Sequence, residues 1–139
     1  MSTGATKLYT QQVLELATSL ANWPLDPGMP FQGRARSASC GSTLAMSLAT
    51  APDGAIAAVG LSAQACAVGQ ASAAIFAKAV CGLTRADIAS SLQAIECWLK
   101  EGGALPDWPG LDAIAAAKAY PGRHGAVLLP WLSALDALP

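Results

Sequence analysis

The chain has 139 residues, a net charge of −1, four cysteines and a single histidine. This length is typical of one domain and is sufficient for a hydrophobic core without cross-links. The balanced charge argues against the basic surface that a nucleic-acid-binding protein needs, and no basic amphipathic segment indicates a membrane-surface protein. We therefore expect a single domain over residues 1–139, with no nucleic-acid partner and no membrane partner.

Two segments of the sequence bear on the compartment in which the protein works. Residues 55–77 carry no charged side chain, but they are mostly Ala, Gly, Ser and Gln, so we expect no transmembrane helix there. The N-terminal residues lack the apolar core of a signal peptide. The sequence thus predicts a cytoplasmic protein with reduced thiols. Reduced cysteines favour metal binding or packing over disulfides.

The first half of the chain predicts one helix and three strands. An apolar stripe from Val13 to Leu20 predicts a helix over residues 8–21, followed by a proline-containing loop over residues 22–32. Alternation of apolar and small polar residues then predicts strands. They cover residues 33–40, 42–51 and 55–65, and a hairpin at Pro52-Asp53-Gly54 joins the last two.

The second half of the chain predicts helices. Residues 67–80 are rich in alanine, and Thr84, with Asp87 three residues later, marks the start of a helix that ends near residue 101. Further helices are expected over residues 111–119 and from Pro121 onward, with Pro130 near the first turns of the last one. An N-terminal helix, a three-stranded antiparallel sheet and C-terminal helices packed on one face make an α+β fold.

Cys40 and Cys66 lie at the ends of predicted strands, among small uncharged residues. Cys66 is at the junction of the third strand and a helix, where helix-end N–H groups stabilise a thiolate. Cys40 precedes Gly41, which permits a bend or a close approach. Antiparallel strands can bring both cysteines to one end of the sheet. A metal site, a disulfide and core packing all fit this pattern, and composition alone favours packing.

The other cysteines and the histidine indicate structural roles. Cys81 lies 15 residues after Cys66, so helical geometry places it in another region of the fold. We expect Cys81 and Cys97 to be packing thiols. His124 is expected to be a surface or capping residue rather than a metal ligand.

The charged residues show no catalytic arrangement. Arg34 and Arg36 alternate on the first predicted strand and so could share one face, which we expect to be solvated rather than a docking surface for an acidic partner. The sequence has no Ser-His-Asp order, no phosphate-binding loop and no paired carboxylates near its motifs. We therefore expect no enzymatic activity.

Three motifs resemble those of a known family. Cys40-Gly41-Ser42 is similar to a Cys-Gly-Asp motif, and the run from Ala65 to Ala73 is similar to Gly-Cys-Ala-Ile-Ser-x-Ala-Ser. The run from Pro121 to Trp131 is similar to Pro-x-Arg-x-Lys-Cys-Ala-x-Leu-Pro-Trp. These motifs resemble the iron–sulfur cluster assembly scaffold family (NifU N-terminal and IscU-like proteins), and the last is found in its SufU-type branch. The resemblance spans most of the chain and implies a SufE/NifU-like domain with its ligands at one exposed end.

The chain departs from this family at two ligand positions. Ser42 stands where the family has its aspartate, and Ala126 stands where it has its third cysteine, so we interpret both as vestigial. A shift of one residue would align His124 with the family's histidine, but Gly125 would then replace the cysteine. The resemblance therefore leaves Cys40 and Cys66 as metal ligands, with His124 as a further candidate.

The resemblance implies a scaffold-like iron–sulfur cluster assembly protein that binds iron or a [2Fe–2S] cluster through the remaining cysteines. Its implied partners are a cysteine desulfurase and iron–sulfur acceptor proteins. A homodimer would supply the four thiolates that a cluster needs. One alternative is a pseudo-scaffold without cluster that docks the desulfurase as an adaptor or regulator. A weaker alternative is a zinc-binding sulfur acceptor.

Overall fold

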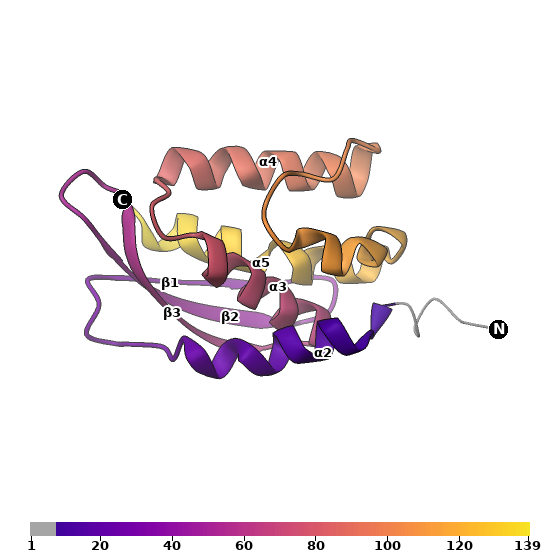
Figure 1. Ribbon diagram of the computed structural model, residues 1–139, viewed down its shortest axis with the longest axis horizontal. Coiled ribbons are helices and arrows are strands. Elements are labelled where there is room, and N and C mark those ends of the chain that lie inside the picture. Colours follow the sequence, from indigo (N-terminus) through magenta and orange to yellow (C-terminus); the bar gives the residue numbers. More distant parts are fainter. Residues whose placement is uncertain (1–7) are drawn as a thin grey trace.

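The computed structural model describes residues 8–139. In chain order the helices, short 3-10 helices (η) and strands are α2 (Gln11–Thr18), η1 (Ser19–Asn22), β1 (Phe31–Arg36), β2 (Thr43–Thr50), β3 (Ile56–Gln64), α3 (Ala67–Ala79), α4 (Arg85–Glu101), η2 (Leu111–Ala119) and α5 (Pro121–Ala137). Figure 1 shows the sheet with α3 and α5 over one face and α4 outside them. Helix α2 packs beside α3. The predicted α+β fold is confirmed.

The sheet is antiparallel, with strand order β1-β2-β3. Its inner face is apolar because Leu44, Met46 and Leu48, alternate residues of β2, are buried beneath the helices. The hairpin between β2 and β3 turns at Gly54, whose φ of 89° is a left-handed conformation that favours glycine. This pairing brings the start of β2 beside the end of β3, so that Thr43 lies opposite Gln64.

Residues 23–29, which we call the crossing segment, pass from the free edge of β3 onto the outer face of the sheet. The N–H of Leu61 donates to the carbonyl of Trp23 (2.8 Å), and the N–H of Asp26 donates to Oγ of Ser47 (3.0 Å). Gly60 makes this path possible, because a Cβ atom there would collide with the backbone carbonyl of the crossing segment. The chain therefore lies directly on the sheet at this point.

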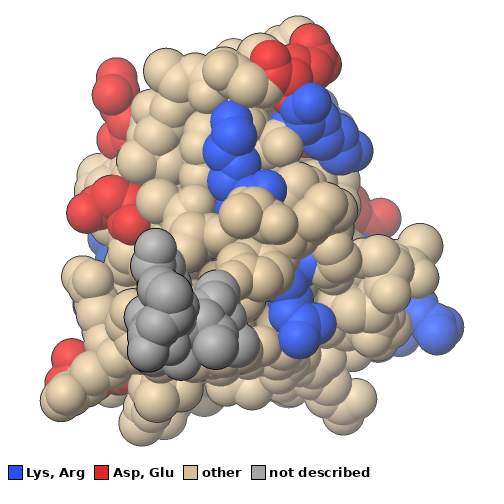
Figure 2. Space-filling view, turned by 90° about the vertical axis from the view of Figure 1, so that its right-hand side faces the viewer, with Lys and Arg blue, Asp and Glu red and all other residues tan. Residues whose placement is uncertain are grey.

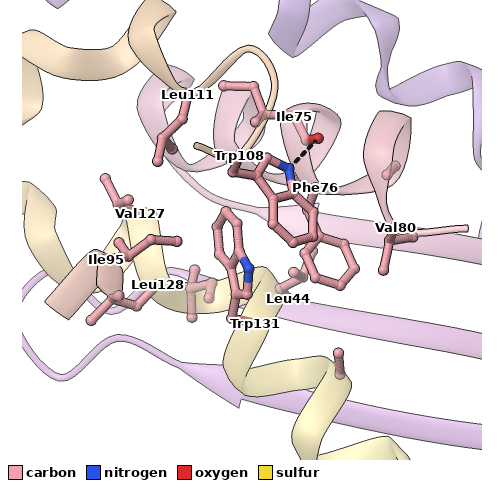
Figure 3. Close-up of a cluster of buried hydrophobic side chains, with 14 of the residues drawn as sticks. Leu44, Ile75, Phe76, Val80, Ile95, Trp108, Leu111, Val127, Leu128 and Trp131 are labelled. Atoms are coloured by element: carbon pink, nitrogen blue, oxygen red, sulfur yellow. Dashed lines mark hydrogen bonds between the residues drawn. The ribbon is translucent and has the colours of Figure 1, made fainter. Parts of the chain in front are cut away.

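Phe76, Trp108 and Trp131 pack together in the core between the sheet and the helices (Figure 3). Phe76 stacks on Trp108 at a centroid distance of 5.4 Å, and Trp131 meets both rings edge-on. Such pairs contribute about 0.5–1.5 kcal/mol each beyond the burial of their area. Nε1 of Trp108 donates to the carbonyl of Ile75 (3.0 Å), whereas the buried Nε1 of Trp131 has no hydrogen-bond partner within the described chain.

Helix α4 begins and ends where the sequence predicts, and α5 begins at the predicted residue. Thr84 and Asp87 form a reciprocal capping box at the start of α4, and Gly102, with a φ of 74°, ends this helix. Pro121 opens α5, where a missing N–H is harmless. Across residues 8–139, no helix combines the length and the hydropathy needed to cross a membrane.

Three local predictions were wrong in detail. Strand β1 ends at Arg36, not at residue 40, because Ser37 closes a turn in which its N–H donates to the carbonyl of Ser42 (2.8 Å). Residues 111–119 form a 3-10 helix with a kink at Ile114. Pro130 lies in the middle of α5, which continues through it.

Candidate functional site

The turn between β1 and β2 and the junction of β3 with α3, which contain the two cysteines of the motifs, lie at the same end of the sheet, at the right-hand side of Figure 1. Cys40 is in the turn between β1 and β2, and Cys66 is the N-cap residue of α3, directly after β3. The antiparallel register joins the two places, because the start of β2 pairs with the end of β3. Cys40 is exposed and Cys66 is half-buried.

Three serines surround Cys40. Its Sγ lies 3.3 Å from Oγ of Ser37 and 3.1 Å from Oγ of Ser42, while Ser39 contacts Ser37 (3.1 Å between the hydroxyl oxygens). A thiol can donate only one hydrogen bond, whereas a thiolate can accept several. The hydroxyls of Ser37 and Ser42 therefore lower the pKa of the Cys40 thiol, with smaller contributions from the backbone of Ser42 and the charge of Arg123.

Cys66 has a different environment. Its carbonyl accepts from the N–H of Gln70 (3.0 Å) in the first turn of α3, but its side chain makes no capping hydrogen bond. The side chain packs in part against the hydrophobic core. Cys66 is therefore held by the helix and the core, whereas Cys40 is held by hydroxyl groups in a turn.

Arg123 links the two cysteines. It lies in the first turn of α5, and its guanidinium donates to the hydroxyl of Tyr9 (3.2 Å). This hydrogen bond is the main cause of the raised pKa of Arg123, and the nearness of the guanidinium to Tyr9 and to both cysteines adds to it. One positive charge thus acts on both thiols. Figure 2 shows this end of the molecule, with basic groups across its middle and acidic groups at its margins.

The start of α5 contacts both cysteine segments. A Cβ atom at Gly125 would collide with the hydroxyl of Ser37, so glycine lets α5 approach the turn of Cys40. One residue later, the buried Ala126 faces the first turn of α3, where a Cβ atom at Gly69 would lie 3.3 Å from its methyl group. Ala126, which the resemblance matches to the family's third cysteine, therefore lies at this end and presents a methyl group.

Of the remaining residues that the sequence analysis singled out, Ser42 contacts Cys40, and the others have separate environments. Ser42, at the position of the family's aspartate, is buried and touches Cys40 as described above. His124 is buried, which corrects the expected surface position, and its Nε2 lies 2.8 Å from the carbonyl oxygen of Lys118 in η2. Its ring thus caps a backbone carbonyl. Cys81 and Cys97 are exposed, so they are not buried packing thiols as predicted.

The donor atoms of one chain are few. Among the described residues, no group of three or more His, Cys, Asp or Glu side chains is arranged to hold a metal ion. A [2Fe–2S] cluster needs four protein donors, usually thiolates. The two thiols of one chain therefore provide half of such a set, and Ser42 and Ala126 add no strong ligand.

Sequence reasoning missed three residues of this site, namely Ser37, Tyr9 and Arg123. Arg123 belongs to the Pro-x-Arg part of the third motif, which was the available signal for it. Ser37 belongs to the serine-rich run Ser37-Ala38-Ser39-Cys40-Gly41-Ser42, whose residue types favour local side-chain hydrogen bonds. Tyr9 carries no signal, because its contact with Arg123 joins residues 114 positions apart.

The chain is similar to solved structures over nearly its whole length. It is 26% identical to the N-terminal part of a nitrogen-fixing NifU-like protein from Brucella abortus, with a TM-score of 0.87 and coverage of 97% of this chain and 94% of that one. It is 19% identical to a SUF-system iron–sulfur cluster assembly scaffold protein from Fervidobacterium islandicum, with a TM-score of 0.81 and coverage of 95% and 97%. No protein-family model and no curated protein matches the sequence.

The class of protein follows from these similarities together with the site. A three-stranded sheet covered by helices on one face is the fold that this chain shares with the NifU-like and SUF-system scaffold structures. The chain has the fold of the NifU/IscU-like scaffold family, and the resemblance predicted from its cysteine motifs is confirmed.

Proposed function

We propose that the protein is a non-catalytic component of iron–sulfur cluster assembly, which binds iron or a [2Fe–2S] cluster through Cys40 and Cys66. The observation that carries this proposal is the pairing of the two cysteines at one end of the sheet, where Arg123 acts on both. The cluster is cargo, received as iron and sulfur and passed on. A reducing compartment such as the cytoplasm would keep both thiols free.

The donor count supports sharing of the cargo between two chains. Two copies that meet at their cysteine ends would supply four thiolates, which is the number that a [2Fe–2S] cluster needs. Cys40 is exposed, so it is accessible to a second copy. The positive charge of Arg123 beside the thiols would offset part of the negative charge of a thiolate-ligated cluster.

Anaerobic reconstitution tests this proposal. The protein is incubated with ferrous iron, cysteine, a cysteine desulfurase and dithiothreitol, which reduces the persulfide sulfur to sulfide. The visible absorption, the iron, zinc and sulfide contents and the molar mass are then measured. We expect one cluster for every two chains and a dimer that forms only with the cluster. Cys40→Ser or Cys66→Ser should abolish loading.

The chain contains its own control for this experiment. Cys81 and Cys97 are exposed thiols outside the site, so replacing both with serine should leave the loading unchanged. A colourless wild-type protein, or loading that depends on Cys81 and Cys97, would contradict the proposal. Zinc in place of iron, lost in the same Cys40 and Cys66 variants, would indicate the zinc-binding sulfur acceptor instead.

A second candidate is an adaptor that holds no cluster and docks a cysteine desulfurase. The observation that favours it is Ala126, which is fully buried against α3 and presents a methyl group where the family has a thiolate. An adaptor would bind the desulfurase without iron. Titration calorimetry with the metal-free protein tests this, because Cys40→Ser together with Cys66→Ser should leave an adaptor's affinity unchanged.

A further inference from the structure

The crossing segment leaves part of the outer sheet face uncovered, and this part forms a hollow of about 580 Å³. We call it the arginine hollow. Its lining residues come from all three strands, next to the cysteine end, and are Arg34, Ala35, Arg36, Thr43, Leu44, Ala45, Ser62 and Gln64. The proposed site does not use this surface.

The strand register explains the shape of the arginine hollow. One row across the sheet is Arg34, Ala45 and Ser62, and the next row is Arg36, Thr43 and Gln64. Each row begins with a long cationic side chain on β1 and continues with shorter side chains. Alternate residues of a strand lie about 7 Å apart, so the two guanidinium groups repeat at the spacing of an extended chain.

The positive charges of Arg34 and Arg36 are not neutralised by carboxylates of the described chain. Asp136 contacts this strand, but its carboxylate accepts from the backbone N–H of Arg34 (2.9 Å). Within residues 8–139, neither guanidinium is in an ion pair. Residues 1–7 contain no acidic side chain, so they do not complement the hollow either. An occupant that neutralises Arg34 and Arg36 must therefore come from another molecule.

Two features show how such an occupant would lie. Asp136 already caps the β1 edge at Arg34, which disfavours the addition of a partner strand along that edge. The short side chains of Thr43, Ala45 and Ser62 instead allow a backbone to approach the face itself. Because only two arginines face the hollow and the whole chain has a net charge of −1, the surface suits a few carboxylates better than a polyanion.

We propose that the arginine hollow docks an acidic, extended segment of a partner protein, with carboxylates at alternate positions that meet Arg34 and Arg36. Arg36 directly precedes Ser37 of the cysteine turn, and Gln64 is two residues before Cys66. A segment bound there lies beside the proposed cargo site. This inference goes beyond the proposed function and does not require that the cargo be a cluster.

The test uses a defined peptide and the metal-free full chain, so it is independent of cluster loading. The probe is a peptide of alternating Glu and Thr, and its counterpart has Gln in place of Glu. Binding is followed by ¹⁵N chemical shifts at low salt. We expect the Glu peptide to shift the amides of Thr43, Ala45 and Ser62, and the Gln peptide to shift none of them.

Charge reversal makes the test specific. Arg34→Glu with Arg36→Glu should weaken binding of the Glu peptide about tenfold or more, since two exposed ion pairs are lost and two repulsions are added. Arg85→Glu with Lys100→Glu makes the same charge change on α4, away from the hollow, and should weaken it less than twofold. Both arginines should be needed for the full effect.

Other outcomes would overturn the proposal. Equal weakening by both double variants would mean that only net charge is sensed. Shifts confined to other surfaces would place the acidic segment elsewhere. Tighter binding of a single-stranded oligonucleotide or of anionic phospholipid vesicles to the same amides would replace the acidic protein segment with a different class of partner.

Discussion

Cys40 is in a turn whose hydrogen bonds come from its own neighbours, and this makes its ionisation sensitive to single substitutions. The hydroxyls of Ser37 and Ser42 lower its pKa. We therefore expect iodoacetamide to alkylate Cys40 at lower pH than a cysteine in an unfolded peptide. Ser42→Ala should move the pH–rate profile upward, as measured by peptide mass spectrometry, because it removes a donor to the thiolate.

The same pKa has a consequence for stability. The folded-state pKa of Cys40 lies below the unfolded value, so its ionisation favours the folded state above the unfolded pKa. This contribution is lost as the pH falls through the folded pKa. Ser91→Ala is the control for the alkylation experiment. It removes a serine far from Cys40, whose hydroxyl donates to the carbonyl of Asp87, and it should leave the pH–rate profile unchanged. A profile for Ser42→Ala that coincides with that of the wild type would contradict the assignment.

Gly125 offers a second test at the residue scale. A Cβ atom there would collide with the hydroxyl of Ser37, which is the movable end of a side chain, so we expect Gly125→Ala to fold. Alanine even favours a helix over glycine by about 1 kcal/mol. The displaced hydroxyl should leave Cys40, and the alkylation profile should move in the same direction as for Ser37→Ala.

Gly122→Ala is the matched control for this variant. It lies in the same helix, and a Cβ atom there would meet nothing within 4 Å. In the Ser37→Ala background, Gly125→Ala should add no further shift, because both changes act through one hydroxyl. Additive shifts would show that Gly125 acts on Cys40 by another route.

At the scale of elements, the sequence predicted the helices and strands because their signals are local. The capping box at Thr84 is a clear case, since both partners lie within four residues. We expect Thr84→Ala to lower the free energy of unfolding by about 1 kcal/mol in urea titrations. Ser90→Ala, a substitution at an exposed position of the same helix, should change it by much less. Equal losses of stability in the two variants would show that the capping box does not stabilise α4.

The element boundaries that sequence reasoning missed have two origins, a local turn at the end of β1 and a tertiary contact before η2. Strand β1 was expected to reach Cys40, but Gly41, with a φ of 72°, and the hydrogen bond from its N–H to the carbonyl of Ser37 form a turn instead. The 3-10 geometry of η2 has a tertiary origin instead, because Trp108 anchors the preceding loop on α3. Tertiary anchoring overrides helical periodicity there.

Helix α5 brings position 126 to the site, and this suggests a gain-of-function test. Ala126→Cys with Ser42→Asp restores both family ligand types, and Ser42 already touches Cys40. We expect iron or a cluster bound by the monomer rather than by a dimer, measured by metal content and molar mass. The added sulfur in a buried position should lower stability by about 1–3 kcal/mol. Loading that still requires a dimer would show that position 126 does not reach the cargo.

At the scale of the whole molecule, the crossing segment decides which part of the sheet is open. Gly60→Ala would press a methyl group into the backbone of Pro24 and the side chain of Ser47. We expect it to lower stability by about 1–3 kcal/mol and to expose the covered part of the face to hydrogen exchange. Gly122→Ala again serves as the control. Unchanged exchange at residues 23–29 would show that the segment accommodates the methyl group.

The pairing of the cysteines could be predicted from topology, since antiparallel strands return Cys66 to the end where Cys40 lies. The contribution of α5 to the site could not be predicted from the sequence. Gly125 and Ala126 meet segments that lie about ninety and sixty residues away in the chain, and only the packing of α5 across β1 and α3 brings them there. The missing donors, by contrast, were visible in the sequence as Ser42 and Ala126.

The aromatic cluster of the core gives the protein an optical reporter. The rings of Trp108 and Trp131 are 5.1 Å apart and inclined by 76°, so their electronic transitions couple and should give a paired band in near-ultraviolet circular dichroism. The buried Nε1 of Trp131 makes no hydrogen bond in the described chain, which favours blue emission. A coloured iron–sulfur centre would absorb that emission by energy transfer. The arrival and departure of cargo can therefore be timed in the unlabelled protein by its own fluorescence.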